Sequence, residues 1–126
     1  MNKLVIFLFL FTFSNSYSSE IQFEKIFDEL NKPWSLSFID KENIIITEKS
    51  GKLITLNLKS KSKNEIQHNL SLISLGQGGL LDVLYNDNQI YISYSENRGN
   101  WKTSTSVAKG SFNKNTINFK NIFTAE

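Results

Sequence analysis

The sequence predicts an all-β fold, and three observations support this. Short runs rich in Ile, Val, Phe, Tyr and Thr recur along the chain, separated by clusters of Asn, Asp, Gly, Lys and Ser, as expected for strands and turns. Helical periodicity is hard to find. A hairpin-like pattern also recurs at a fixed spacing, which is typical of repeat architectures.

Eight main strands are expected, with a shorter run at Asn64–Gln67. The eight are Ile21–Phe27, Ser35–Ile39, Ile44–Glu48, Lys52–Leu58, Leu80–Tyr85, Gln89–Tyr94, Ser104–Phe112 and Ile117–Phe123. Tight turns are expected at residues 40–43, 49–51, 86–88 and 113–115. Asn and Asp tolerate left-handed backbone there, and Gly supplies positive φ.

The repeat relates residues 38–48 to residues 84–94 without a gap, an offset of 46 (84 − 38). Each copy reads as a strand, a polar turn and an Ile-x-Ile strand followed by a hydroxyl residue. A period in the mid-forties with about four strands per unit is the spacing of β-propeller blades. Because a ring closes with about four to eight blades, two blades imply an incomplete propeller. Two unrelated hairpins in a β-sandwich are the alternative.

Composition excludes several kinds of site. The chain has 126 residues, a formal net charge of +2, no Cys and a single His. So small a charge gives no support to nucleic-acid binding, which needs a clustered basic face. The absence of Cys excludes disulfides, a thiol nucleophile and thiolate metal ligands, and one His excludes a multi-His metal site. The length allows one small domain or part of a larger one.

The first segment is predicted to be a cleaved signal peptide. Lys3 supplies a positive charge, residues 4–13 are apolar except for one Thr, and residues 14–19 are small and polar apart from one Tyr. A membrane-spanning helix is the alternative, but it needs about 20 apolar residues. We therefore expect cleavage after Ser18, which divides the chain into a signal peptide (1–18) and a periplasmic or secreted portion (19–126).

Residues 76–83 are the most informative segment. They read Gly-Gln-Gly-Gly-Leu-Leu-Asp-Val and contain three of the six glycines. Gln77 would present an amide that both donates and accepts, which suits the carbonyls and hydroxyls of a quinone or a sugar. The alternative is a glycine-rich turn that opens a blade, with Gln77 bonded to its own backbone. Asp82 is expected to accept hydrogen bonds inside its strand.

Together with three other segments, this one resembles the glucose/sorbosone dehydrogenase family of soluble aldose sugar dehydrogenases that depend on pyrroloquinoline quinone (PQQ). The other segments are residues 32–36 (Lys-Pro-Trp-Ser-Leu), residues 46–53 and residues 90–95. The resemblance covers about residues 30–123, which correspond to roughly the first third of a family member.

The resemblance implies a six-bladed β-propeller with PQQ and Ca²⁺ at its central axis. It also implies oxidation of the anomeric carbon of an aldose to a lactone. In the family a His takes the proton of the C1 hydroxyl while hydride passes to PQQ, and an external acceptor then takes the electrons. The expected partners are thus an aldose and an electron acceptor, with no nucleic acid and no membrane span after signal cleavage.

Only Gln77 carries over as a family site residue, near substrate and cofactor. The catalytic His and most ligands of the cofactors lie beyond Glu126 in the family pattern, so no catalytic or metal-binding residue is expected here and this polypeptide alone should be inactive. His68 is expected to be a solvated loop residue. Trp101 could stack on a sugar but is expected to fold back onto its own domain. A non-catalytic secreted propeller that binds carbohydrate or protein is the alternative function.

Overall fold

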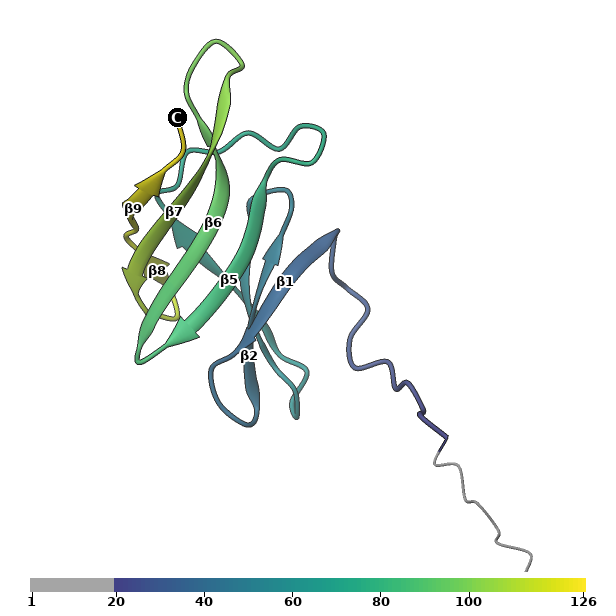
Figure 1. Ribbon diagram of the computed structural model, residues 1–126. Coiled ribbons are helices and arrows are strands. Elements are labelled where there is room, and N and C mark those ends of the chain that lie inside the picture. The colour runs from purple at the N-terminus through teal and green to yellow at the C-terminus, as the bar shows by residue number, and fades with distance from the viewer. Residues whose placement is uncertain (1–19) are drawn as a thin grey trace, which may run out of the picture.

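The computed structural model describes residues 20–126, which form nine strands (Figure 1). The strands are β1 (Pro33–Phe38), β2 (Asn43–Glu48), β3 (Leu53–Asn57), β4 (Lys63–His68), β5 (Leu80–Asn86), β6 (Gln89–Asn97), β7 (Thr103–Ser111), β8 (Thr116–Ile117) and β9 (Lys120–Thr124). No helix occurs among the described residues, so the all-β prediction is confirmed. The signal peptide and its cleavage after Ser18 fall outside the described residues.

The strands form two sheets, each built on four antiparallel strands. The first has the order β1-β2-β3-β4-β8 and the second β5-β6-β7-β9. Every pairing is antiparallel except that of β4 with the two-residue strand β8. Apart from β8, which adds to the edge of the first sheet, the strands of each sheet lie in the order in which they occur along the chain, as in a propeller blade.

The strand expected at Ile117–Phe123 is in fact divided between the two sheets. β8 pairs with β4 of the first sheet, and β9 returns to pair with β7 of the second. The Asn69 side chain holds the crossing point, because its Oδ1 accepts from the backbone N–H of Phe119 (2.8 Å) and its Nδ2 donates to the carbonyl of Phe119 (3.1 Å). This side chain replaces the ladder hydrogen bonds that the strand loses there.

The strand expected at Ile21–Phe27 was a wrong prediction. Residues 20–32 contain no strand, and Ile21 and Phe23 are exposed. Their composition suits a strand, but a strand also needs a partner for its backbone groups, and no described segment pairs with this one. Phe27 and Leu30 nevertheless pack against the outer face of the first sheet.

The two sheets pack face to face through a common apolar core. The first sheet contributes Ile45, Leu53 and Ile66 with Ile117 of β8, and the second contributes Leu80, Val83, Ile90, Ile92, Tyr94 and Ala108. Burial of these mainly aliphatic side chains is the main force that joins the sheets, since each buried Val, Leu or Ile side chain contributes about 1.5–3 kcal/mol.

Hydroxyl side chains bridge the edges at which β1 and β5 meet. Ser37 Oγ accepts from the N–H of Tyr85 (3.0 Å), and Thr47 Oγ1 donates to the carbonyl of Leu81 (2.6 Å). Ser35 Oγ donates to Asp82, whose side chain is exposed rather than enclosed in its strand. These side chains satisfy the free edge of β5 without merging the two sheets into one.

Candidate functional site

Gln77 occupies the tip of a tight turn between β4 and β5. The N–H of Gly78 donates to the carbonyl of Leu75 (2.7 Å), which closes the turn. Gly76, the first central residue, has a positive φ of +54°, whereas Gln77, the second, does not have a positive φ. This pattern is typical of a type II′ turn. The Gln77 side chain is exposed, and its amide forms no hydrogen bond within residues 20–126. Its donor and its acceptor are therefore both available.

The glycines after Gln77 allow two backbone segments to approach closely. A Cβ at Gly79 would lie 2.1 Å from the carbonyl oxygen of Lys49, and a Cβ at Gly78 would lie 2.9 Å from that of Ile73. Lys49 belongs to the turn between β2 and β3 of the first sheet. Gly79 thus serves the contact between the two sheets, whereas Gly78 lets the turn pack on the segment that precedes it.

The turn that carries Gln77 is held from both sides. The Lys49 ammonium donates to the carbonyl of Gly76, and the N–H of Ser95 on β6 donates to the carbonyl of Gly79 (2.9 Å). The segment before the turn runs beside β6 as well, with a hydrogen bond from the N–H of Ile73 to the carbonyl of Ser95 (3.1 Å). Gln77 is consequently displayed on a fixed base.

The Gln77 turn, the β2–β3 turn and the β6–β7 hairpin lie at one end of the two sheets. Figure 1 shows residues 70–79 and the β6–β7 loop together at the upper end, whereas the β1–β2 and β5–β6 turns point to the lower end. Antiparallel connectivity requires this arrangement, because alternate turns of a meander lie at the same end. A ligand held by Gln77 would therefore bind at the upper end.

His68 lies at the end of β4 and is half-buried, so the expectation of a solvated loop residue is wrong. Its Nε2 lies 2.7 Å from the carbonyl oxygen of Gly51, and its Nδ1 accepts from the N–H of Leu70 (3.3 Å). Its ring also packs edge-to-face on Phe119. Since a carbonyl can only accept, Nε2 must carry the proton. Both ring nitrogens have structural partners, and neither is available as a general base.

We expect the neutral imidazole of His68 to populate the Nε2–H tautomer almost exclusively, because Nε2 faces a carbonyl and Nδ1 accepts from an N–H. Long-range ¹H–¹⁵N correlation spectra measure this directly, and the sequence contains one His, so the signals need no assignment. Averaged nitrogen shifts, which indicate fast exchange between tautomers, would contradict the two backbone contacts.

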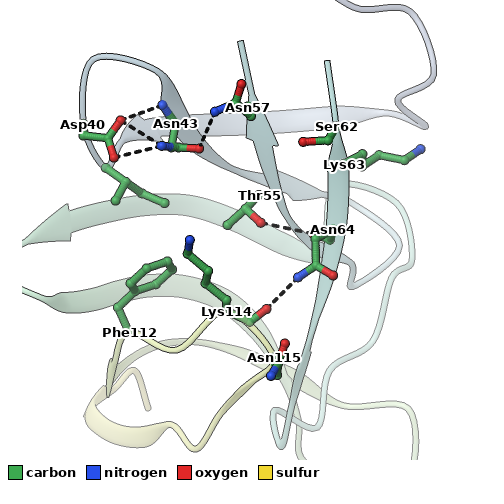
Figure 2. A pocket seen from close by; sticks show the side chains of 11 residues that line it. Asp40, Asn43, Thr55, Asn57, Ser62, Lys63, Asn64, Phe112, Lys114 and Asn115 are labelled. Carbon is green, nitrogen blue, oxygen red and sulfur yellow. Dashed lines mark hydrogen bonds between the residues drawn. The ribbon is translucent and has the colours of Figure 1, made fainter. Parts of the chain in front are cut away.

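A hollow of about 390 Å³ lies at the opposite end, where the β1–β2 and β3–β4 turns meet residues 112–115 (Figure 2). Its polar side chains bond mostly to one another. Asn43 donates to Asp40 (2.9 Å), Asn57 donates to Asn43 (3.0 Å) and Asn64 donates to the carbonyl of Lys114 (2.6 Å). The backbone N–H of Glu42, followed by the Asn43 amide, lowers the pKa of Asp40. These contacts stabilise the turns, and the polar groups of the hollow are occupied by one another. Gln77 therefore remains the candidate site residue.

Comparison with known proteins identifies the family. The family profile described as glucose/sorbosone dehydrogenase matches residues 30–126. The chain belongs to the glucose/sorbosone dehydrogenase family. No curated protein sequence gave a match.

Two solved structures of similar sequence agree with this membership. A glucose dehydrogenase superimposes with a TM-score of 0.76 at 28% identity, over 82% of this chain and 33% of its own. The apo form of the soluble aldose sugar dehydrogenase from Escherichia coli gives a TM-score of 0.72 at 28% identity, over 80% of this chain and 32% of its own. This family member therefore spans about a third of the length of the structures it matches.

A third structure extends the agreement in fold. The PQQ-bound form of an aldose sugar dehydrogenase from Streptomyces coelicolor superimposes with a TM-score of 0.70 at 14% identity, over 81% of this chain and 33% of its own. With two packed sheets and no helix in residues 20–126, the chain matches part of these propellers. The prediction of an incomplete β-propeller with about two blades is thus confirmed.

Near the upper end, this family member ties β6, β7 and β9 together around Glu96. Its carboxylate accepts from Ser106 (2.6 Å) and Asn121 (2.9 Å) and pairs with Arg98 (3.1 Å). The hydrogen bond from Ser106, ahead of the Arg98 charge, holds the pKa of Glu96 below its ordinary value. Tyr94 donates to Asn121 (2.7 Å), and burial raises the pKa of its phenol. The cluster is internally satisfied and serves the blade itself.

Ser106→Ala should make the folded state less stable at neutral pH, by about 2 kcal/mol, because a hydrogen bond to a charged group is lost. The lowered pKa of Glu96 means that its contribution is present above the ordinary carboxylate pKa and is lost as the pH falls through the lowered value. The difference from wild type, measured by urea unfolding, should therefore shrink between about pH 6 and pH 3. Ser104→Ala is the control, since Ser104 bonds only a backbone carbonyl, and its effect should not vary with pH.

Residues 20–126 contain neither a metal-binding cluster nor a membrane-spanning helix. Within residues 20–126, no group of three or more His, Cys, Asp or Glu side chains is placed to hold a metal ion. The same stretch has no helix of the length and apolarity needed to cross a membrane.

Proposed function

We propose that this chain forms the first two blades of a PQQ-dependent sugar dehydrogenase that oxidises the anomeric carbon of aldoses to lactones. The family match over residues 30–126 carries the proposal. PQQ, when bound, supplies the hydride acceptor, and an external acceptor then takes the electrons. A signal peptide over residues 1–18, cleaved after Ser18, would deliver the enzyme to the periplasm or the exterior.

Gln77 is the site residue that we propose from this chain. Its amide is exposed at the upper end with both hydrogen-bonding functions free, so it can donate to a carbonyl and accept from a hydroxyl. Its base is fixed by Lys49 and β6, which favours a defined orientation of the ligand.

The described residues do not suffice to hold either cofactor. A single neutral amide can orient one carbonyl or hydroxyl of PQQ, but PQQ is an anion and needs cationic partners. No metal-binding cluster is placed within residues 20–126, and we propose that the Ca²⁺ ligands come from other parts of the enzyme.

The outer face of the first sheet supports the proposal that residues 19–126 are the N-terminal portion of a larger propeller. Leu36 and Phe38 of β1 are 53% and 60% exposed, beside a hollow of about 440 Å³ lined mainly by apolar side chains. In the second sheet, the equivalent face is the one that packs against the first sheet. A further blade would bury it.

Gene disruption tests the proposed function in the native host. Loss of the gene should remove PQQ-dependent oxidation of aldoses, measured with a dye as acceptor, from cell-envelope extracts. The wild-type gene should restore it, and Gln77→Ala should restore at least about tenfold less. Gln67→Ala, an exposed glutamine on β4, is the matched control and should restore full activity. Unchanged aldose oxidation after disruption would refute the proposal and favour the non-catalytic alternative.

The 126-residue polypeptide by itself should be inactive even when PQQ and Ca²⁺ are supplied. Its single His is committed to backbone contacts, so it lacks a base for the C1 hydroxyl. Dye-linked oxidation of glucose by the purified chain measures this, and turnover above the blank would contradict it.

A further inference from the structure

The tip of the β6–β7 hairpin has an unusual residue in its tight turn. The N–H of Lys102 donates to the carbonyl of Gly99 (2.9 Å), and that of Arg98 donates to the carbonyl of Lys102 (2.9 Å). The two central residues, Asn100 and Trp101, have φ values of +49° and +60°. Positive φ at both central positions defines a type I′ turn, in which the second position is ordinarily Gly.

Trp101 contributes little to the stability of the fold. Its side chain is 81% exposed, so the expectation that it folds back onto its own domain is wrong. A bulky side chain is also strained at positive φ, where Gly would not be. Folding therefore gives no reason for a Trp at this position. Strain of this kind, when the surrounding structure maintains it, points to a role in function.

The hairpin fixes the backbone from which the indole projects. β6 and β7 pair up to Asn97 and Thr103, directly below the turn. The Asn97 side chain accepts from the N–H of Gly99 (2.9 Å), and Arg98 pairs with Glu96 (3.1 Å). A backbone that is already ordered at the tip loses little conformational freedom when a ligand binds.

A hollow of about 490 Å³ adjoins the indole. It is lined by Ile73, Asn97, Gly99, Asn100 and Trp101. The Asn100 side chain and the Asn97 Nδ2 form no hydrogen bond within residues 20–126, so two amides are free beside an aromatic face. Amides bond hydroxyl groups in either direction, and the indole face suits the apolar C–H face of a pyranose. Together these groups match the chemistry of a sugar ring.

The hairpin also lies at the same end as Gln77. The N–H of Asn97 donates to the carbonyl of Ser71 (3.0 Å), and Ile73, which lines the hollow, bonds Ser95. The segment that leads to Gln77 therefore runs along the base of the hairpin, and Figure 1 shows the two loops at the upper end.

We propose that Trp101 and the adjoining amides form a carbohydrate-binding subsite in which a pyranose ring stacks on the indole. The substrate class rests on the proposed function, whereas the binding itself requires neither PQQ nor oxidation. The ring belongs either to a free aldose or to a further unit of an oligosaccharide, and the two sources share the same chemistry.

Tryptophan fluorescence of the full chain tests the subsite. Trp34→Phe leaves Trp101 as the sole Trp, and this variant is titrated with glucose, maltotriose and cellotriose. We expect a saturable change in emission with at least one sugar. Saturation by glucose identifies a free aldose as the ligand, and saturation by a trisaccharide alone identifies an oligosaccharide.

Calorimetric titration with the same sugars compares three variants. Trp101→Ala should weaken binding at least tenfold, Trp101→Phe should retain part of the affinity, and Trp34→Phe should bind as wild type does. Trp101→Gly should raise the melting temperature, because the strain at positive φ is relieved.

Three results would overturn the proposal. The first is equal sugar affinity in wild type and Trp101→Ala, and the second is no binding of any of the three sugars. The third is a lower melting temperature for Trp101→Gly, which would give the indole a structural role. Gene disruption reports on aldose oxidation independently, so failure of the subsite and failure of the proposed function are distinguishable.

Discussion

Gly79→Ala should destabilise the folded chain by more than about 3 kcal/mol, enough to unfold most small domains. Gly79 has a φ of +140°, and its added Cβ would lie 2.1 Å from the carbonyl oxygen of Lys49. The obstacle is backbone, which cannot rotate away as the end of a side chain can. Either the β5 entry or the β2–β3 turn would have to move, and the contact between the two sheets would be lost.

Gly76→Ala is the matched control for this prediction. Gly76 lies three residues earlier, has a φ of +54° and has no atom within 4 Å of the added Cβ. Only the left-handed backbone is strained, at about 1–2 kcal/mol. Urea unfolding followed by circular dichroism compares the variants. Equal losses would show that backbone conformation, and not the contact with Lys49, is the reason for Gly79.

The same glycines show what the sequence could and could not predict. Their density and position correctly indicated a turn that opens a blade. The sequence did not indicate the structural partner of Gly79, because the carbonyl of Lys49 is 30 residues away and every residue has a carbonyl. Local composition predicts where the backbone adopts an unusual conformation. Packing between distant segments determines which atoms leave no room for a side chain there.

Strand predictions failed for a related reason. Residues 21–27 and 117–123 both have strand-like composition, yet the first forms no strand and the second is divided between two sheets. Composition describes how a residue suits a sheet, but pairing depends on which edges are free. The Asn69 side chain that holds the crossing at Phe119 is 50 residues distant, and no pattern in the sequence links the two.

The candidate site was predictable only in part. Gln77 was identified from its motif, and its exposed amide agrees with a binding role without testing it. His68 and Trp101 were misplaced, because a polar connector and a polar loop gave no sign of the Gly51 carbonyl or of the left-handed turn. The Gly-Asn-Trp-Lys sequence at the hairpin tip could have indicated a type I′ turn, since Asn favours its first central position.

Leu80→Ala should destabilise the chain by about 2–4 kcal/mol, and Leu84→Ala, on the same strand, by less than about 1 kcal/mol. Leu80 is fully buried between the two sheets, whereas Leu84 is 55% exposed on the outer face of the second sheet. The two substitutions remove the same atoms from β5, so only the surroundings differ. Urea unfolding of the 126-residue chain measures both, and similar losses would contradict the assignment of the core to the space between the sheets.

Leu84 also distinguishes two states of the protein. If a third blade covers the outer face of the second sheet, as we propose for the whole enzyme, Leu84 becomes a buried side chain there. Its replacement by Ala should then approach the loss expected for Leu80, about 2–4 kcal/mol. The loss should remain small in the 126-residue chain and become large in a longer protein that contains the following blade. A small loss in both would mean that the outer face stays open to solvent, contrary to a closed ring of blades.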